Sequence, residues 1–402
     1  MVPNGWKKGL LDEGIELISG QHVEANCVNN LGVGIPYLTG PADFPNGKIV
    51  VTKFTNEGKK FSKKGDLLIT VKGSGTGKVI ESDNEYAISR QLMAIRPKTF
   101  DSKFVYYNLV SSLGRYEDAA AGLIPGISRE DVLHTPLLIP PIDEQMAIAQ
   151  ILSTWDQAIS TTEKLLENSQ QQKKALMQQL LTGKKRLLDE NGVRFSGEWK
   201  KVKFSALGKC IRGVSYKPED ICLERSESTV RLLRSTNIQN GILNNQELVI
   251  LPKKLIKPNQ YLQDGDLAIC MANGSKTLVG KSAIYSETKE LYTVGAFCAI
   301  FRPLNVSNKI FVKFVFESES YKQQISVILA GSSINNLKGS DIESLQISIP
   351  TEIKEREEIA NVLLIADQEI EILQKKLDCL KQEKKALMQQ LLTGKKRVKV
   401  AA

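Results

Sequence analysis

Two glycine-containing segments have the residue types of a phosphate-binding loop. One is GSGTGK at residues 73–78, and the other is NGSKT at residues 273–277. The Walker pattern requires a glycine where this chain has Lys72 and a Ser or Thr where it has Val79. No G-x-G-x-x-G motif opens a helix either, so the sequence does not support nucleotide-cofactor binding. We interpret both segments as polar turns between strands.

Residues for other kinds of catalysis are scarce. Neither histidine, His22 nor His134, lies near a Cys or Ser in a nucleophile motif. We find no Asn/Asp-Pro-Pro-aromatic motif of amino methyltransferases and no carboxylate and lysine set with nuclease spacing. The six cysteines form no CxxC pair, which argues against a zinc ribbon or a disulfide framework and indicates reduced thiols in a cytoplasmic protein. The sequence predicts no catalytic residue, no metal site and no cofactor in this chain, which favours a binding or assembly component.

Several cationic side chains lie beside residues that hydrogen-bond well to nucleic acid. The net charge of +9 is compatible with a polyanionic partner but too small to establish one. Lys and Arg suit phosphates, whereas Asn, Ser and Thr can also reach base edges. For any single lysine, a solvated surface is the simpler interpretation. The candidate DNA-binding residues are Lys59, Lys60, Lys63, Lys72, Ser74, Thr76, Lys78, Arg231, Arg234, Ser235, Asn237, Asn273, Ser275 and Lys276.

The length and composition indicate a folded protein of more than one domain. A chain of 402 residues is too long for one ordinary core, so we expect two or three domains. No apolar run reaches eighteen residues, so we expect neither a transmembrane helix nor a membrane partner. The charge is uneven, since residues 1–147 hold 16 basic and 17 acidic side chains and residues 198–350 hold 20 and 14.

An internal repeat predicts the architecture. Residues 173–186 and 384–397 both read KKALMQQLLTGKKR, an identity too long for chance. Weaker matches precede it in the same order in both halves, among them Trp-Lys-Lys at 6–8 and 199–201, Gly-Asp-Leu at 65–67 and 265–267, Arg-Pro at 96–97 and 302–303, and Ile-Pro at 139–140 and 349–350. The chain therefore consists of a globular part, a helix, a second globular part and a second helix.

Each repeat ends a long segment without Gly or Pro, at about 144–182 and 355–393. Pro at the entry and Gly with lysines at the exit are helix boundary signals. A seam of apolar residues at alternating spacings of four and three predicts a coiled coil, which we expect to be antiparallel. Two helices that each pack on their own globular part are the alternative. The seam residues are Ile148, Leu152, Trp155, Ile159, Leu166, Leu176, Leu180, Ile359, Leu363, Ile370, Leu373, Leu377, Leu387 and Leu391.

The globular parts contain short β-branched runs bounded by Gly, Asn and Pro, which predict strands, and segments 102–113 and 308–320 predict short helices. We expect an α+β fold: two globular domains related by pseudo-twofold symmetry and joined by two long antiparallel coiled-coil helices. The predicted boundaries are 1–143 for the first domain, 144–197 for the central helix and linker, 198–354 for the second domain and 355–402 for the distal helix and basic tail.

With its two copies of KKALMQQLLTGKKR, the FSGEWKKV segment at 195–202 and the Gly-Asp-Leu strand starts, the chain resembles the specificity subunit of type I restriction-modification systems. The resemblance covers essentially the whole chain. It implies that each globular domain is a target-recognition domain that reads one half of a bipartite, asymmetric DNA site. It also implies that the helices set the spacer between the halves.

The resemblance further implies the partners. They are double-stranded DNA, two methyltransferase subunits that dock on the helices, and restriction (translocase-nuclease) subunits. S-adenosylmethionine and ATP then belong to the partner subunits, and this chain is not itself an enzyme. Two other hypotheses remain open at this stage: an enzyme with an unrecognised site, such as a stand-alone DNA methyltransferase or nuclease, and a coiled-coil scaffold without a nucleic acid role.

Overall fold

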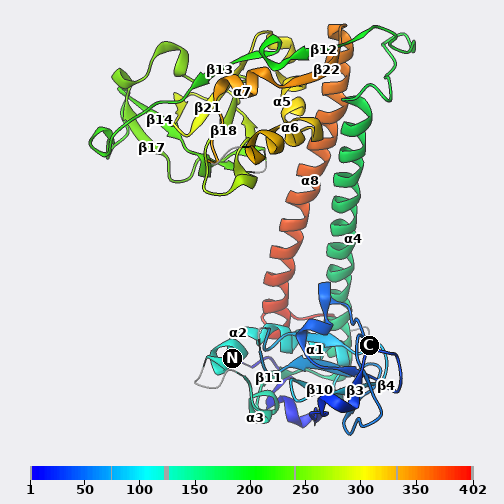
Figure 1. The fold of residues 1–402 in the computed structure, drawn as a ribbon. Coiled ribbons are helices and arrows are strands. Elements are labelled where there is room, and N and C mark those ends of the chain that lie inside the picture. Colours follow the sequence, from blue (N-terminus) through cyan, green and yellow to red (C-terminus); the bar gives the residue numbers. More distant parts are fainter. Residues whose placement is uncertain (1, 74, 122–125, 240, 332–333, 400–402) are drawn as a thin grey trace. The chain divides into compact units, whose positions relative to one another are not determined.

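The computed structural model describes residues 2–73, 75–121, 126–239, 241–331 and 334–399. The chain forms two compact units. Unit 1 comprises residues 1–164 and 374–402, and unit 2 comprises residues 165–373 (Figure 1). Each unit therefore combines one globular part with a portion of both long helices.

Unit 1 is built on a four-stranded antiparallel sheet in the order β2-β10-β7-β8. A two-stranded ribbon, β1-β11, and a small five-stranded sheet, β3-β5-β4-β9-β6, complete it. Its strands are β1 (Lys7–Leu10), β2 (Ile15–Ser19), β3 (Val28–Asn29), β4 (Ile35–Leu38), β5 (Phe54–Thr55), β6 (Phe61–Ser62), β7 (Leu67–Thr70), β8 (Val79–Glu81), β9 (Tyr86–Ile88), β10 (Leu92–Pro97) and β11 (Pro136–Ile139).

Unit 2 repeats this plan with strands that occur in the same chain order. Its four-stranded antiparallel sheet is β13-β21-β18-β19, its ribbon is β12-β22, and its additional sheets are β17-β14-β20 and β15-β16. Its strands are β12 (Trp199–Lys203), β13 (Gly208–Arg212), β14 (Thr229–Leu233), β15 (Ile238–Gln239), β16 (Ile242–Leu243), β17 (Val249–Pro252), β18 (Leu267–Cys270), β19 (Ser282–Ile284), β20 (Tyr292–Val294), β21 (Cys298–Pro303) and β22 (Gln346–Pro350).

The short sequence matches mark one ion pair that occurs in both units. In unit 1 the Asp66 carboxylate accepts hydrogen bonds from Nε and Nη2 of Arg96, at 3.0 and 2.8 Å, and links the start of β7 to β10. Asp266 and Arg302 make the equivalent contact in unit 2, at 3.0 and 2.7 Å. The hydrogen bond to Asp66 raises the pKa of the Arg96 guanidinium. Bidentate pairing of this kind fixes direction as well as distance, which aligns the two central strands.

Glycine precedes the aspartate in both copies because the turn requires a left-handed backbone. The φ angle is +88° at Gly65 and +85° at Gly265. A side chain at such a position is strained in an L-residue, so glycine is the residue that enters this turn at no steric cost.

Short helices cover the four-stranded sheet of each unit. Segments 102–113 and 308–320 were predicted to be helical, and both predictions are confirmed by α1 and α5. Asp101 and Ser318 cap α1 and α6 by accepting from Phe104 N and Tyr321 N. The short helices are α1 (Ser102–Ser111), α2 (Leu113–Ala120), α3 (Arg129–Leu133), α5 (Lys309–Glu317), α6 (Glu319–Ala330) and α7 (Gly339–Ser344).

The two long helices are α4 (Ile142–Leu180) and α8 (Ile353–Leu392), each within two residues of its predicted start. Each begins directly after the proline-containing entry and ends just before a glycine with positive φ, Gly183 or Gly394. All fourteen predicted seam residues are buried or half-buried. Among the described residues, no helix combines the length and hydropathy that crossing a bilayer requires.

Ion pairs within each unit show that α4 and α8 run antiparallel, as predicted. In unit 1, Glu163 on α4 pairs with Lys381 on α8 at 2.8 Å. Further toward the start of α4, Asp156 pairs with Lys384 at 2.5 Å. In unit 2, Ser169 donates to Glu369 at 3.2 Å. Also in unit 2, Lys173, further toward the end of α4, pairs with Asp367, further toward the start of α8, at 2.5 Å. In both units, moving toward the start of one helix moves toward the end of the other.

The ends of the helices pack into the globular cores, which the sequence did not reveal. Leu391 and Leu392, near the end of α8, belong to the buried core of unit 1. Leu180 and Leu181, at the end of α4, belong to that of unit 2. The repeat at the end of α4 therefore packs on the globular part of unit 2, and the repeat at the end of α8 packs on that of unit 1.

The starts of the helices pack on their own globular parts, since Ile148 and Leu152 belong to the core of unit 1 and Ile359 and Leu363 to that of unit 2. The coiled-coil prediction and the alternative, in which each helix packs on its own globular part, therefore each describe part of the helices.

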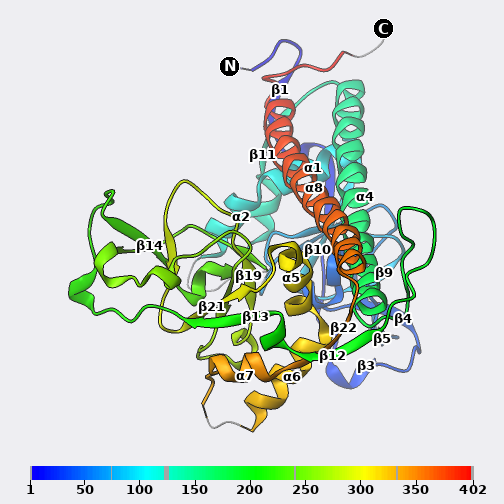
Figure 2. The same ribbon diagram turned by 90° about the horizontal axis from the view of Figure 1, so that it is seen from above.

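The last residue of the repeat makes the same two contacts in both copies. Arg397 binds the Glu144 carboxylate with two nitrogens and lies 5.6 Å from the Trp6 ring, in unit 1. Arg186 binds both oxygens of Glu355, at 2.5 and 2.7 Å, and lies 5.9 Å from the Trp199 ring, in unit 2. Figure 2 shows the chain before β1 beside the segment after α8, where Arg397 also donates to Asn4 O at 2.9 Å.

Candidate nucleic-acid interface

Both segments that resembled phosphate loops form the hairpin loop between equivalent strands. Residues 71–78 join β7 to β8, and residues 271–281 join β18 to β19. The prediction that both are polar turns between strands is confirmed. The repeat of the fold therefore brings predicted DNA-binding residues of the two halves, which share little sequence, to the same place in each unit.

The loop of unit 1 is a tight glycine-rich turn. Gly73, Gly75 and Gly77 have φ angles of +88°, +108° and +85°. The Thr76 hydroxyl donates to Gly73 O at 2.8 Å, which closes the turn. A Cβ on Gly77 would lie 2.9 Å from Leu113, so glycine also allows the loop to approach α2. Lys72 and Lys78 are exposed here, and Ser74 lies outside the described residues.

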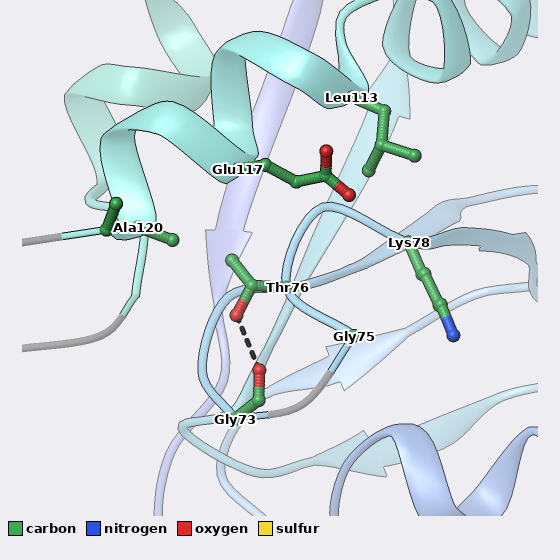
Figure 3. Close-up of a pocket in the computed structure, with 8 residues that line it drawn as sticks. Gly73, Gly75, Thr76, Lys78, Leu113, Glu117 and Ala120 are labelled. Carbon is green, nitrogen blue, oxygen red and sulfur yellow. Dashed lines mark hydrogen bonds between the residues drawn. The ribbon is translucent and has the colours of Figure 1, made fainter. Parts of the chain in front are cut away.

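An open cavity of about 380 Å³ separates this loop from α2. Figure 3 shows the Glu117 carboxylate projecting from α2 over the loop, while the Lys78 side chain points away from it. Glycines on one wall and Ala120 on the other leave the space open. A carboxylate at such a place can accept a hydrogen bond from an exocyclic amino group of a base.

The loop of unit 2 keeps one glycine with positive φ, Gly280 at +84°, and is otherwise held by side-chain hydrogen bonds. Asn273 Oδ1 accepts from Ser275 N at 3.0 Å, and Lys276 Nζ donates to Leu329 O at the end of α6, at 3.2 Å. Asn335, which the sequence did not single out, donates to Gly274 O at 2.9 Å. Ser275 and Lys276 are both exposed on this turn, and the Lys276 ammonium group is the one of the two that is tied back to α6.

The base of this second loop is fixed by a buried hydroxyl. Tyr321 on α6 donates to Gly280 O at 2.7 Å, and burial raises the pKa of its hydroxyl well above the ordinary value. The hydroxyl therefore remains a donor at any physiological pH. Burial also raises the pKa of Cys270, at the end of β18 beneath the loop.

The three lysines predicted around β6 do not share one edge of unit 1, because Lys63 N donates to Asp66 Oδ2 at 2.7 Å, at the end of β7 opposite the 71–78 loop. Lys59, Lys60 and Lys63 are exposed and flank β6. The Lys60 carbonyl accepts from Ile88 N at 3.0 Å, which places this backbone beside the end of β9. Phosphate contact by these side chains remains a prediction.

The predicted residues of β14 and the turn after it are largely engaged within unit 2. Arg231 forms an ion pair with Glu290 and lies 5.6 Å from the Tyr292 ring. Arg234 Nη2 donates to Glu247 O at 3.1 Å, and Ser235 is half-buried. These contacts use side-chain groups that base or phosphate contacts would need.

Asn237 has a structural role. Its side chain is buried; Oδ1 accepts from Arg234 N at 2.8 Å, and Nδ2 donates to the Gln246 carbonyl at 2.7 Å. We therefore do not retain Asn237 among the candidates for base contact. Its polar type and its place beside arginines suggested readout, but burial could not be derived from local sequence.

No catalytic constellation is found in the part of the chain that the structure describes. Within that part, no three His, Cys, Asp or Glu side chains form a group that could hold a metal ion. The six cysteines are free thiols. Burial raises the pKa of Cys210 and of Cys298 to about 12 in each case, the opposite of a reactive cysteine.

Comparison with known families agrees with the duplicated fold. The model of a family described as the type I restriction modification DNA specificity domain matches residues 3–169 and again residues 197–382. The two matched segments correspond to the two globular parts, each with most of the helix that follows it.

Curated relatives carry related names. The chain is 36% identical over 152 residues to the type I restriction enzyme EcoKI specificity subunit of Escherichia coli K12, which covers 38% of this chain and 32% of that protein. The match thus spans about a third of that relative. The MjaVIII specificity subunit of Methanocaldococcus jannaschii is 26% identical over 414 residues, with coverage of 99% and 94%.

Solved structures share the fold. The S subunit of a type I restriction-modification system from M. genitalium matches with a TM-score of 0.62 and 18% identity over 98% of both chains. A chain from a structure of complex assembly and conformational transition in a type I system matches with a TM-score of 0.59 and 16% identity, again over 98% of both chains. At these identities the likeness concerns the fold.

Proposed function

The chain belongs to the type I restriction-modification DNA specificity family, and on this premise we propose that it is the DNA sequence-specificity subunit of a type I restriction-modification complex. Each globular domain reads one half of a bipartite, asymmetric site. The first target-recognition domain covers residues 1–143 and the second covers residues 198–354.

One observation carries the proposal: the same sheet presents two different loops. The four-stranded sheets, the Asp-Arg pair and the helix contacts are repeated, while the loops after β7 and β18 differ in sequence and in how they are held. A protein that reads two unlike half-sites needs this combination, because the scaffold must be constant and the surface that contacts bases must vary.

The helices separate the two recognition domains and dock the partners. An antiparallel pair with a buried seam is a stiff spacer, whose length fixes the distance between half-sites. The exposed polar faces near Gln170–Lys174 and Lys381–Lys385 are available for two methyltransferase subunits. Restriction (translocase-nuclease) subunits join the complex that cuts DNA.

The chemistry belongs to those partners in this proposal. S-adenosylmethionine binds the methyltransferase subunits and ATP the restriction subunits, while this chain contributes recognition alone and works in the cytoplasm. The uneven charge supports a larger salt-sensitive, non-specific share of DNA binding in the second domain, where the basic excess lies.

The test is reconstitution. The purified chain alone should neither methylate nor cut DNA, and addition of the cognate methyltransferase subunit should give adenine methylation at one bipartite sequence in a randomised duplex library. Methylation by the chain alone, or methylation by the complex without sequence preference, would refute the proposal.

A further inference from the structure

A second turn lies beside the hairpin loop in both units. In unit 1, residues 89–92 connect β9 to β10, and Leu92 N donates to Ser89 O at 2.9 Å. In unit 2, residues 295–298 connect β20 to β21, and Cys298 N donates to Gly295 O at 2.8 Å. The two turns are equivalent, since they join equivalent strands and close with the same hydrogen bond.

Backbone hydrogen bonds tie each turn to the start of its hairpin loop. Gln91 O accepts from Val71 N at 2.8 Å in unit 1. Phe297 O accepts from Met271 N at 2.8 Å and from Ala272 N at 3.2 Å in unit 2. The residue at the tip of the turn is therefore held rigidly at the same edge of the sheet as the candidate DNA-binding loop.

The tips differ in chemistry. In unit 1 they are Arg90 and Gln91, both exposed, and Arg90 has no hydrogen-bond or ion-pair partner among the residues that the structure describes. In unit 2 they are Ala296 and Phe297, and the Phe297 side chain is 71% exposed. One turn thus offers donors and an acceptor to its surroundings, and the other offers an aromatic ring.

A single exposed apolar side chain is by itself ordinary. Phe297 differs because of its setting: the ring stands on a turn fixed by three backbone hydrogen bonds, next to the polar loop of Asn273, Ser275 and Lys276. A rigid apolar tip within a polar, cationic face suits a DNA groove, where apolar side chains contact the C5-methyl group of thymine.

We propose that Phe297 is a specificity-determining residue that packs against a thymine methyl group in the half-site read by the second recognition domain. The inference rests on the proposed function. Arg90 and Gln91, at the equivalent turn, suit hydrogen bonding to purine edges. The two units therefore use one turn for two kinds of base contact, which accounts for the difference at its tip.

The experiment removes the methyl group from the DNA and the ring from the protein in turn. Once the methylation pattern of the wild-type complex defines the site, each thymine of the second half-site is replaced singly by deoxyuridine, and binding is measured by fluorescence anisotropy. For the wild-type complex we expect one replacement to weaken binding about fourfold, the cost of removing one methyl group from an apolar contact. For F297A and F297Q the same replacement should change binding less than twofold.

Val306 supplies the matched control, since its side chain is also 71% exposed and apolar. It lies just beyond the other end of β21, about 20 Å along the strand from Phe297. V306A should retain the full deoxyuridine effect. Thermal unfolding of all variants identifies any change in folding.

The outcomes distinguish a failure of the Phe297 assignment from a failure of the proposed function. If the wild-type complex binds one sequence specifically and F297A keeps the same deoxyuridine effect, the Phe297 assignment is overturned and the proposed function stands. A uniform loss of affinity in F297A at every position would also overturn it. If the wild-type complex shows no sequence preference, the proposed function itself fails.

Discussion

Among the described residues of unit 2, the Arg186–Glu355 pair is one of the most buried ion pairs, together with Arg302–Asp266, and its loss should be damaging. Glu355 is fully buried, and Arg186, at the end of the first repeat, keeps 20% of its side-chain exposure. We predict that E355Q destabilises unit 2, because it leaves the guanidinium partly buried without its counter-charge.

The loss of stability expected for E355Q follows from the burial of the ion pair. Removal of one partner from a buried pair costs about 3–5 kcal/mol. Arg186 retains its hydrogen bond to Gly197 O and some contact with water, so we expect the lower end, about 3 kcal/mol. The equivalent E144Q in unit 1 should cost about 1 kcal/mol, because Arg397 is 42% exposed and can turn to solvent.

Hydrogen exchange measured by mass spectrometry can show which unit loses stability in each variant. E355Q should accelerate exchange in β12, β22 and the first turns of α8, and E144Q should act more weakly around β1 and β11. E190Q is the matched control, because the Glu190–Lys354 pair is exposed on both sides and should contribute less than about 0.5 kcal/mol. Equal effects of E355Q and E190Q would refute the reasoning.

Three further outcomes are expected. Cys298 is buried, and burial raises the pKa of its thiol to about 12, so N-ethylmaleimide should label it only on unfolding. Fast labelling of Cys298 in the native chain, read by mass spectrometry, would contradict this. Since φ is +88° at Gly65, G65A should lower the free energy of unfolding by about 1 kcal/mol. Gly114 lies within α2 with open space where a Cβ would be, so G114A should raise the free energy of unfolding by up to about 1 kcal/mol. Melting temperatures in the opposite order would contradict the turn argument. Exchange of the second recognition domain for an electroneutral one should reduce the salt dependence of non-specific DNA binding, measured by titration at several salt concentrations. If the slope of the logarithm of the binding constant against the logarithm of the salt concentration stays unchanged, the phosphate contacts lie elsewhere.

The sequence predicted the features that depend on local pattern. The repeat at 173–186 and 384–397, the helices without Gly or Pro and the strand starts after Gly65 and Gly265 follow from periodicity and turn chemistry, which act over a few residues. The antiparallel direction followed from chain connectivity.

Contacts between residues far apart in the sequence could not be predicted. The pairing of Asp66 with Arg96, the burial of Asn237 and the docking of Leu391 in the core of unit 1 all depend on long-range strand order and packing. The turn tip with Phe297 was missed for the same reason, because its place beside the 271–281 loop is set by two backbone hydrogen bonds across the sheet. Its neighbours Val294, Ala296 and Cys298 are apolar, so nothing in the local pattern marked this ring as exposed.

Domain exchange tests most directly the central claim that each recognition domain reads one half-site. Residues 198–350 would be replaced by the corresponding segment of a relative with another specificity, and the reconstituted methyltransferase complex would modify a randomised duplex library for sequencing. We predict that one half of the methylated sequence changes while the other half and the spacer length stay the same. A change in both halves, or in neither, would contradict the account.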